Sequence, residues 1–212
     1  MVAPSTSSLK DRNTKPLYSL LVLNGVLFWA LAHQGDILAR DWPKLANGWM
    51  AALPLAGVAL TGLLNSVISA DMKARMVFLR WHHPLPGSAA FTKLGPRSDR
   101  VDMAALQAKF GPLPTSPKQQ NLLWYKMFKA VESNPGIEGS HRHFLLARDY
   151  AALLVIMLLV MGTMAAVFIR PWSSVGIFIA LVLVQWAVAM RAANNGGHGL
   201  VINVLALQAT TP

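Results

Sequence analysis

The residues of this chain best suited to chemistry are two pairs of histidines. His82 and His83 stand in the stretch RWHHPLPGS, and His141 and His143 stand in GSHRHF. Imidazole nitrogens bind zinc and act as general bases, so one histidine from each pair could form part of a metal site. Adjacent side chains diverge, however, residues two apart do not share a helix face, and no HExxH motif is present. We therefore expect neither a metal site nor a cofactor. If a metal site exists, these four histidines are its candidate ligands.

The stretch RWHHPLPGS has a simpler interpretation as a turn. A proline disfavours helical geometry in the residue before it, which here is His83. Pro86 and Gly87 are typical turn residues. Ser88 lies close to the histidines in sequence, as a nucleophile beside a base would, but two prolines intervene and no GxSxG motif or useful carboxylate pair occurs. We assign no catalytic residue and expect the stretch to end a helix at the membrane surface.

Basic residues are the second kind of candidate. A guanidinium group makes two parallel hydrogen bonds to a phosphate, which a lysine cannot do. We therefore predict that arginines would bind a phosphorylated or acidic ligand, whereas Lys118, Lys126 and Lys129 would face water or lipid headgroups. The predicted ligand-binding residues are Arg80, Arg97, Arg100 and Arg142. The alternative is unspecific attraction of the whole basic segment to anionic headgroups.

These candidates lie between segments that are apolar enough to cross a membrane. Only 13% of the residues are charged, about half the share in soluble domains. Four segments without a charged side chain occupy residues 17–32, 49–70, 150–169 and 173–190. A span needs about 20 apolar residues, so the first is short. Without cysteine, disulfides and thiolate metal sites are excluded.

The basic residues predict the orientation of the spans. Sixteen of the 19 Lys and Arg residues lie in segments 1–16, 71–149 and 191–212. Basic residues concentrate on the cytoplasmic side of inner-membrane proteins, so both termini and segment 71–149 should be cytoplasmic. Much of the net charge of +10 follows from this topology, so a nucleic-acid partner is possible but not required.

The predicted fold is an all-α integral membrane protein with two transmembrane hairpins, 17–70 and 150–190. Between them lies a small, mainly helical cytoplasmic domain on helical stems, 71–149, with an N-terminal tail, 1–16, and a C-terminal tail, 191–212. Because such a domain buries little surface, and because small residues and amides such as Asn24 and Gln185 favour helix contacts, we expect a homo-oligomer of two to four copies.

Local signals predict the helices of the cytoplasmic domain. One should end at Gly111, and a longer one should start at Pro117, with Ser116 as its N-cap, and end by Pro135. The second span should continue as a helix toward Pro84, and Ser140 should cap the stem that leads to the third span. The run Asn-Asn-Gly-Gly at 194–197 should break the last helix. Residues 200–207 should then form a strand or short helix that docks on the domain or on another copy.

The predicted function is that of a non-enzymatic membrane module. Its basic domain would sense a ligand or dock a cytoplasmic protein and couple that event to the spans. The architecture alone is similar to that of small bacterial membrane effectors and accessory subunits, including those of antiviral defence systems. The alternative is a membrane-embedded enzyme that acts on a lipid or its headgroup through the histidines.

Overall fold

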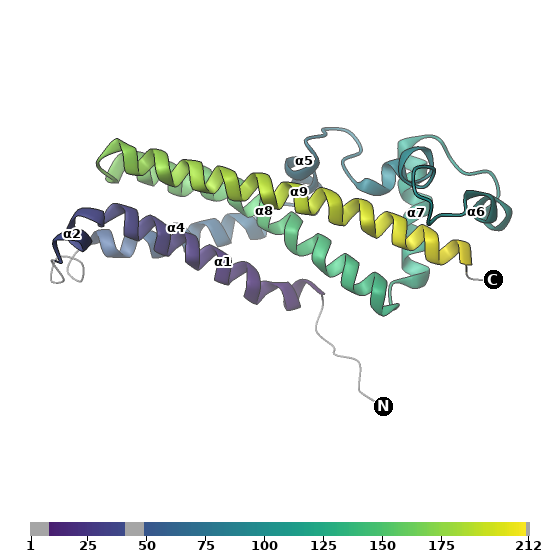
Figure 1. The fold of residues 1–212 in the computed structure, drawn as a ribbon, viewed down its shortest axis with the longest axis horizontal. Helices are drawn as coiled ribbons and strands as arrows, with labels where there is room; N and C mark the ends of the chain where they lie inside the picture. The colour runs from purple at the N-terminus through teal and green to yellow at the C-terminus, as the bar shows by residue number, and fades with distance from the viewer. Residues whose placement is uncertain (1–8, 41–48, 211–212) are drawn as a thin grey trace, which may run out of the picture. The chain divides into compact units, whose positions relative to one another are not determined.

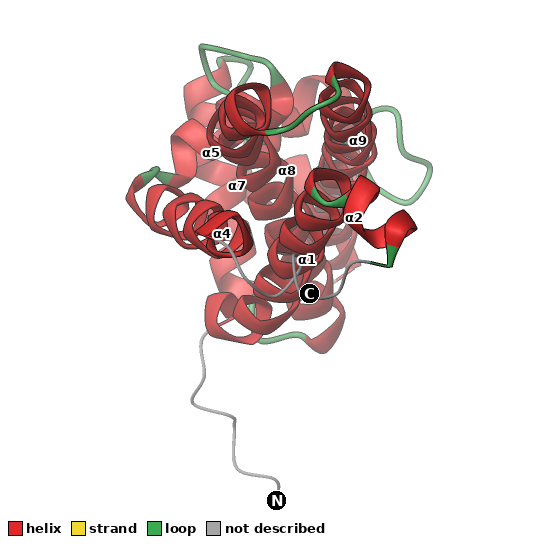
Figure 2. Ribbon diagram, turned by 90° about the vertical axis from the view of Figure 1, so that its left-hand side faces the viewer, coloured by secondary structure: helices red, strands yellow, loops and turns green. Residues whose placement is uncertain are grey.

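The computed structural model describes residues 9–40 and 49–210, apart from the side chains of residues 9–11 and 49–51. Within these ranges every regular element is a helix and no strand occurs (Figures 1 and 2). Long apolar stretches without strand-like alternation favour this outcome. The prediction of an all-α chain is confirmed for the described residues.

Three helices are long and apolar enough to cross a membrane: α1 (Leu9–Ala32), α8 (Pro135–Phe168) and α9 (Trp172–Thr210). A fourth candidate exists if α4 (Trp49–Val67) and α5 (Ala70–Phe78) are taken together as one broken span. These helices identify a membrane protein by their length and composition. The described residues form two compact units. The apolar unit comprises residues up to Ser69 and Asp149–Ala189, and the basic unit comprises Ala70–Arg148 and the residues from Met190.

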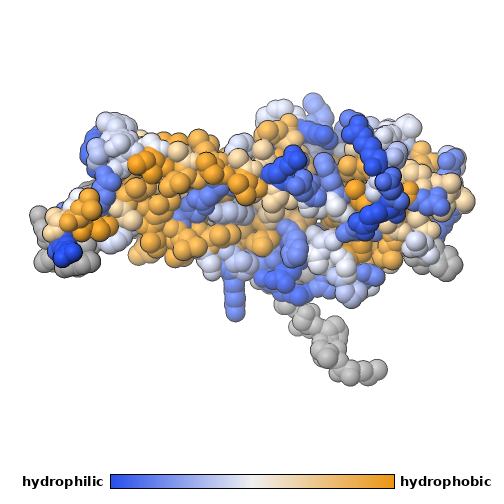
Figure 3. All heavy atoms as spheres, in the orientation of Figure 1, coloured by the Kyte–Doolittle hydropathy of each residue, from blue (hydrophilic) through white to orange (hydrophobic). Residues whose placement is uncertain are grey.

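In the apolar unit, α1 packs against α4, with the short helix α2 (Gln34–Ala39) following α1 (Figure 1). The approach is close at Gly25, where a Cβ atom would lie only 2.8 Å from Cγ2 of Val58. Phe28 of α1 contacts Phe178 of α9 edge to face, with ring centroids 5.5 Å apart. The opposite sides of these helices expose many apolar side chains, and hydrophobic residues cover much of the face of this unit that Figure 3 shows. Such a surface suits a lipid environment.

An amide pair joins two helices of the apolar unit. Asn24 of α1 is buried and exchanges two hydrogen bonds with Gln185 of α9, at 3.1 and 3.0 Å. The hydroxyl of Tyr150 on α8 donates a third hydrogen bond to Oε1 of Gln185, at 2.6 Å. The amides therefore bind between helices, which is the role that the sequence predicts for them.

The basic unit has its own hydrophobic core. It contains α5, a 3₁₀ helix η1 (Pro86–Ala89), a π-helical turn η2 (Ala90–Leu94), α6 (Met103–Phe110) and α7 (Pro117–Val131). The N-terminal part of α8 and the C-terminal part of α9 complete it. The core gathers side chains from η2, α6, α7, α8 and α9: Phe91, Leu106, Trp124, Phe128, Phe144, Leu200, Val204 and Leu205. Thirteen Lys and Arg residues against five Asp and Glu make this unit basic.

The predicted end of α6 and the predicted start of α7 are confirmed. Asp102 caps α6, since its Oδ1 accepts a hydrogen bond from the Ala105 N–H at 2.9 Å. Gly111 ends α6 at a φ of 79°, where any other residue would be strained. Helix α7 begins at Pro117 and ends at Val131; Ser116 occupies the N-cap position as predicted, but its side chain makes no capping hydrogen bond. Pro135 does not end α7, however, but is the first residue of α8.

The predicted break at residues 194–197 is wrong, because α9 continues without interruption to Thr210. Tertiary packing explains why a glycine occupies position 197 inside this helix. A Cβ atom on Gly197 would lie 3.0 to 3.1 Å from atoms of Phe78, Phe144 and Pro86, so only glycine lets these side chains approach the helix. Residues 200–207 are therefore neither a strand nor a separate helix, and they fill the core of their own unit.

Two predictions about the stems are also wrong. The helix of the second span does not continue toward Pro84, since α4 ends at Val67 and α5 occupies Ala70–Phe78. Ser140 is not an N-cap, because α8 already starts at Pro135. The Ser140 hydroxyl instead donates a hydrogen bond to the Gly136 carbonyl at 2.9 Å and accepts one from Nδ2 of Asn203 at 2.9 Å. Ser140 thus links α8 to α9.

Candidate functional site

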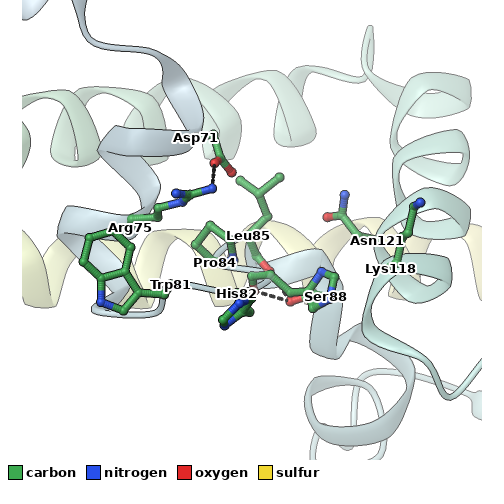
Figure 4. A pocket seen from close by; sticks show the side chains of 10 residues that line it. Asp71, Arg75, Trp81, His82, Pro84, Leu85, Ser88, Lys118 and Asn121 are labelled. Carbon is green, nitrogen blue, oxygen red and sulfur yellow. Dashed lines mark hydrogen bonds and ion pairs between the residues drawn. The ribbon is translucent and has the colours of Figure 1, made fainter.

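The stretch RWHHPLPGS forms one wall of a pocket of about 340 Å³ in the basic unit (Figure 4). This size lies within the range of about 300 to 1,000 Å³ that is typical of small-molecule sites. Side chains reach the pocket from α5, from the loop and η1, and from the start of α7. The lining residues are Asp71, Arg75, Trp81, His82, His83, Pro84, Leu85, Ser88, Lys118 and Asn121.

The loop in this wall has an unusual backbone. Helix α5 ends at Phe78, and both Leu79 and His83 have positive φ angles, of 50° and 49°. Left-handed geometry costs a residue other than glycine about 1 kcal/mol. The buried Ser88 stabilises this loop, because its hydroxyl lies 2.8 Å from the carbonyl oxygen of His83 and 2.6 Å from that of Leu85. Such strain is more common at binding sites than elsewhere.

Ser88 is directed toward the main chain. Its hydroxyl lies within hydrogen-bond distance of two main-chain acceptors, the carbonyl oxygens of His83 and Leu85, whereas a nucleophile would donate to a basic side chain. The side chain is also buried, with 7% of its surface exposed. The geometry therefore favours a structural role for Ser88 in shaping the pocket wall.

The pocket has a surplus of positive charge. Nη2 of Arg75 is 2.7 Å from Oδ2 of Asp71, the only carboxylate among the described residues that line the pocket. The ammonium group of Lys118 and the imidazoles of His82 and His83 add further donors. Nε of Arg75 and Oδ1 of Asn121 are buried and have no hydrogen-bond partner among the described residues. The cationic side chains of Arg75 and Lys118 suit an anionic ligand.

Helix α7 is positioned against this wall by two contacts. Gly87 packs on Trp124 so closely that a Cβ atom there would lie 2.6 Å from Cε3 of the indole. The buried side chain of Gln120 accepts hydrogen bonds from the Phe91 and Thr92 N–H groups at 3.0 and 3.2 Å. Both contacts lie within one turn of Lys118 or Asn121, so they hold the part of α7 that carries these two side chains against the wall.

The four predicted arginines lie at separate places. Arg80 lines a second hollow beside α5, and Arg100 lines a groove next to Asn203 of α9. Arg97 is exposed in the turn after η2, and Arg142 lies on α8. The pocket instead contains two cationic side chains that the sequence reasoning missed as ligand-binding residues, Arg75 and Lys118. The position of Lys118, directly after Pro117 in the first turn of α7, was the only signal for it.

The two histidine pairs also separate. His82 and His83 line the pocket, whereas His141 is half-buried on α8 with its ring 5.0 Å from that of Phe128. Burial is the main cause that lowers the pKa of His141, and the positive charges of Arg148 and Lys129 outweigh the opposite effect of Glu132. Protonation therefore destabilises the folded unit as the pH falls below about 6.5. Among the described residues, no group of three or more His, Asp or Glu side chains is placed to hold a metal ion.

Comparison with known proteins assigns neither a family nor a function to this chain. No protein-family model, curated protein or solved structure matches this chain. The inference of function therefore depends on the pocket, on its charges and on the helices that are suited to a membrane.

Proposed function

We propose that this chain is a non-enzymatic membrane protein whose basic unit binds a phosphate-bearing ligand and transmits that binding to the spanning helices. The observation that carries the proposal is the pocket in which Arg75, His82, His83 and Lys118 surround a space with one carboxylate among its described lining residues. Phosphate groups are bound in proteins by such clusters of N–H donors. The exposed predicted arginines, Arg97 and Arg100, would add to the positive field around it.

The connection of α5 to α4 offers a route for the coupling. Asp71 and Arg75 belong to α5, and only Ile68 and Ser69 separate α5 from the apolar helix α4. Lys118 and Asn121 belong to α7. A ligand held by both helices would stabilise one arrangement of α5 relative to α7. Because only two residues connect α5 to α4, that preference would act on a helix suited to the membrane.

Binding of glycerol 3-phosphate to the purified full chain in a neutral detergent tests the pocket. We expect Lys118→Gln to weaken this binding at least tenfold in isothermal titration calorimetry, because it removes a direct donor. Lys126→Gln is the matched control, since Lys126 lies on the same helix, is exposed and does not line the pocket. Generic charge attraction would give equal losses in both variants. Equal losses, or no binding at all by the wild-type chain, would contradict the proposal.

The proposed topology has four spans, with both termini and segment 71–149 in the cytoplasm. Its support is the distribution of basic residues, since sixteen of 19 lie in these segments. Reporter fusions in bacterial cells at residues 45 and 110 and at the C-terminus test it. A reporter that is active only in the cytoplasm should work at residue 110 and at the C-terminus and fail at residue 45. Activity at residue 45 would show that the topology is wrong.

A further inference from the structure

A second hollow of about 310 Å³ adjoins the pocket and differs from it in character. Its walls are mostly apolar, and several of the side chains are widely exposed: Leu79 by 67%, Trp81 by 73% and Met72 by 38%. We call the lining residues of this hollow the Trp81 patch: Met72, Arg75, Met76, Leu79, Arg80 and Trp81. Large exposed apolar groups in one place indicate a binding surface.

The position of the patch in the chain indicates what covers it. Helix α5 begins three residues after Val67, the last residue of the apolar helix α4. Three residues of chain reach at most about 10 Å. Helix α5, which carries Met72, Arg75 and Met76 of the patch, therefore starts close to the last residue of α4. Its helix also contains Asp71, Lys73 and Arg75, and such charges are costly in the hydrocarbon core but not in the headgroup layer.

The composition of the patch also matches the headgroup layer. An indole ring has an apolar body and a polar N–H, and it is enriched where membrane and water meet. Arg75 and Arg80 line this patch together with Leu79 and Trp81, and basic side chains beside apolar ones favour binding to an anionic membrane surface. A second copy of the chain would present the same positive charges to this surface and repel it. A lipid with a negative headgroup is complementary in both charge and polarity.

The pocket and the patch share two residues, Arg75 and Trp81. A ligand whose phosphate lay among Arg75, Lys118 and the two histidines would therefore have its remaining atoms beside the apolar side chains of the patch. A free phosphate ester would use only the pocket. The pocket with the adjoining patch fits an amphiphile, with an anionic head and an apolar tail.

We infer that the ligand of the basic unit is an anionic phospholipid, with its headgroup phosphate in the pocket and its acyl chains against the Trp81 patch. The inference depends on the proposed function, because it names the source of the phosphate. The protein would then bind and sense anionic lipid at the surface of its own membrane. Met72 and Leu79 line the patch but not the pocket, which allows the two parts to be tested separately.

The experiment compares three probes on the full chain in a neutral detergent at fixed concentration. Dioctanoyl phosphatidylglycerol has the anionic head and the tails, dioctanoyl phosphatidylcholine has the same tails without net charge, and glycerol 3-phosphate has the head without tails. We expect the anionic lipid to bind at least tenfold more tightly than either other probe. In the double variant Met72→Ser and Leu79→Ser this advantage should disappear, and the affinity for glycerol 3-phosphate should stay unchanged. Leu122→Ser, at an exposed leucine of α7 outside the patch, is the control and should bind like the wild type.

Each other outcome is decisive. Equal affinity for phosphatidylglycerol and glycerol 3-phosphate would overturn the lipid inference and leave the proposed phosphate site intact. Equal affinity for the two lipids would also overturn it, because the patch would then be a general apolar surface. Failure of all three probes to bind would overturn both the inference and the proposed function.

Discussion

Replacing Gln120 with leucine is expected to destabilise the basic unit by about 3 kcal/mol. Gln120 is 1% exposed, and its Oε1 accepts hydrogen bonds from the Phe91 and Thr92 N–H groups of η2. Its Nε2 donates to the Thr115 carbonyl at 2.7 Å. Leucine has a similar size but makes none of these bonds. The Phe91 N–H would then stay buried without an acceptor, and such a group costs about 1 to 3 kcal/mol.

Amide hydrogen exchange of the full chain in detergent measures this effect locally. Exchange in η2 and α7 should become faster by about two orders of magnitude, which corresponds to the expected loss. Gln119→Leu makes the same chemical change one residue earlier, at an exposed position, and should leave exchange within about 0.5 kcal/mol of the wild type. Because α7 carries Lys118, the Gln120 variant should also bind glycerol 3-phosphate more weakly. Similar exchange in the two variants would show that Gln120 does not hold η2 on α7.

The second large effect is expected at Gly197, where Gly197→Leu should destabilise the basic unit by about 3 kcal/mol. A Cβ atom at this position would already lie 3.0 Å from Cζ of Phe78 and 3.1 Å from Cε2 of Phe144 and Cγ of Pro86. These atoms surround it from three side chains, so no single rotation makes room for a larger residue. The loss of packing should exceed the gain in helix propensity, which is about 1 kcal/mol.

Alanine at two positions of α9 separates packing from helix propensity. Gly199→Ala should stabilise the unit by about 0.5 to 1 kcal/mol, because no atom lies within 4 Å of the added Cβ. Gly197→Ala should destabilise it, since the same methyl group would contact Phe78, Phe144 and Pro86. Chemical unfolding followed by circular dichroism in detergent gives the sign of each change. Stabilisation by both alanines would mean that Gly197 serves no close contact.

Local signals were sufficient for the helical class and for much of the inner part of the basic unit. Gly111 ends α6 and Pro117 starts α7 as predicted, because prolines and glycines act within one turn of the chain. Long apolar segments likewise indicated helices suited to a membrane, and the described chain contains three, or four with the broken pair. The amides Asn24 and Gln185 were assigned to helix contacts because lipid offers them no other partner.

The candidate site depended on contacts between distant segments. Lys118 and Asn121 lie on α7, more than thirty residues after His82 and His83, and no spacing in the sequence brings them to one pocket. We chose Arg80, Arg97, Arg100 and Arg142 because arginine is a better phosphate ligand than lysine. The chemistry of a residue type does not tell where the fold places that residue. In the fold, Arg80 and Arg100 line two different hollows. The residues that the pocket shares with the Trp81 patch are Arg75 and Trp81.

The sequence by itself determined the composition-driven properties of this protein: its helical class, its helices apolar enough to cross a membrane, its basic segments and the helix boundaries at Gly111 and Pro117. The tertiary structure alone decided the course of α9 and the make-up of the pocket. Asn194 to Gly197 form a break signal in isolation, since glycine in a helix costs about 1 kcal/mol relative to alanine. In the fold, the same glycines admit Phe78, Phe144 and Pro86 to the surface of α9, and the buried residues that follow keep the helix intact. Contacts of this kind outweigh the low helix propensity of glycine, because each buried apolar side chain contributes about 1.5 to 3 kcal/mol to the stability of the fold.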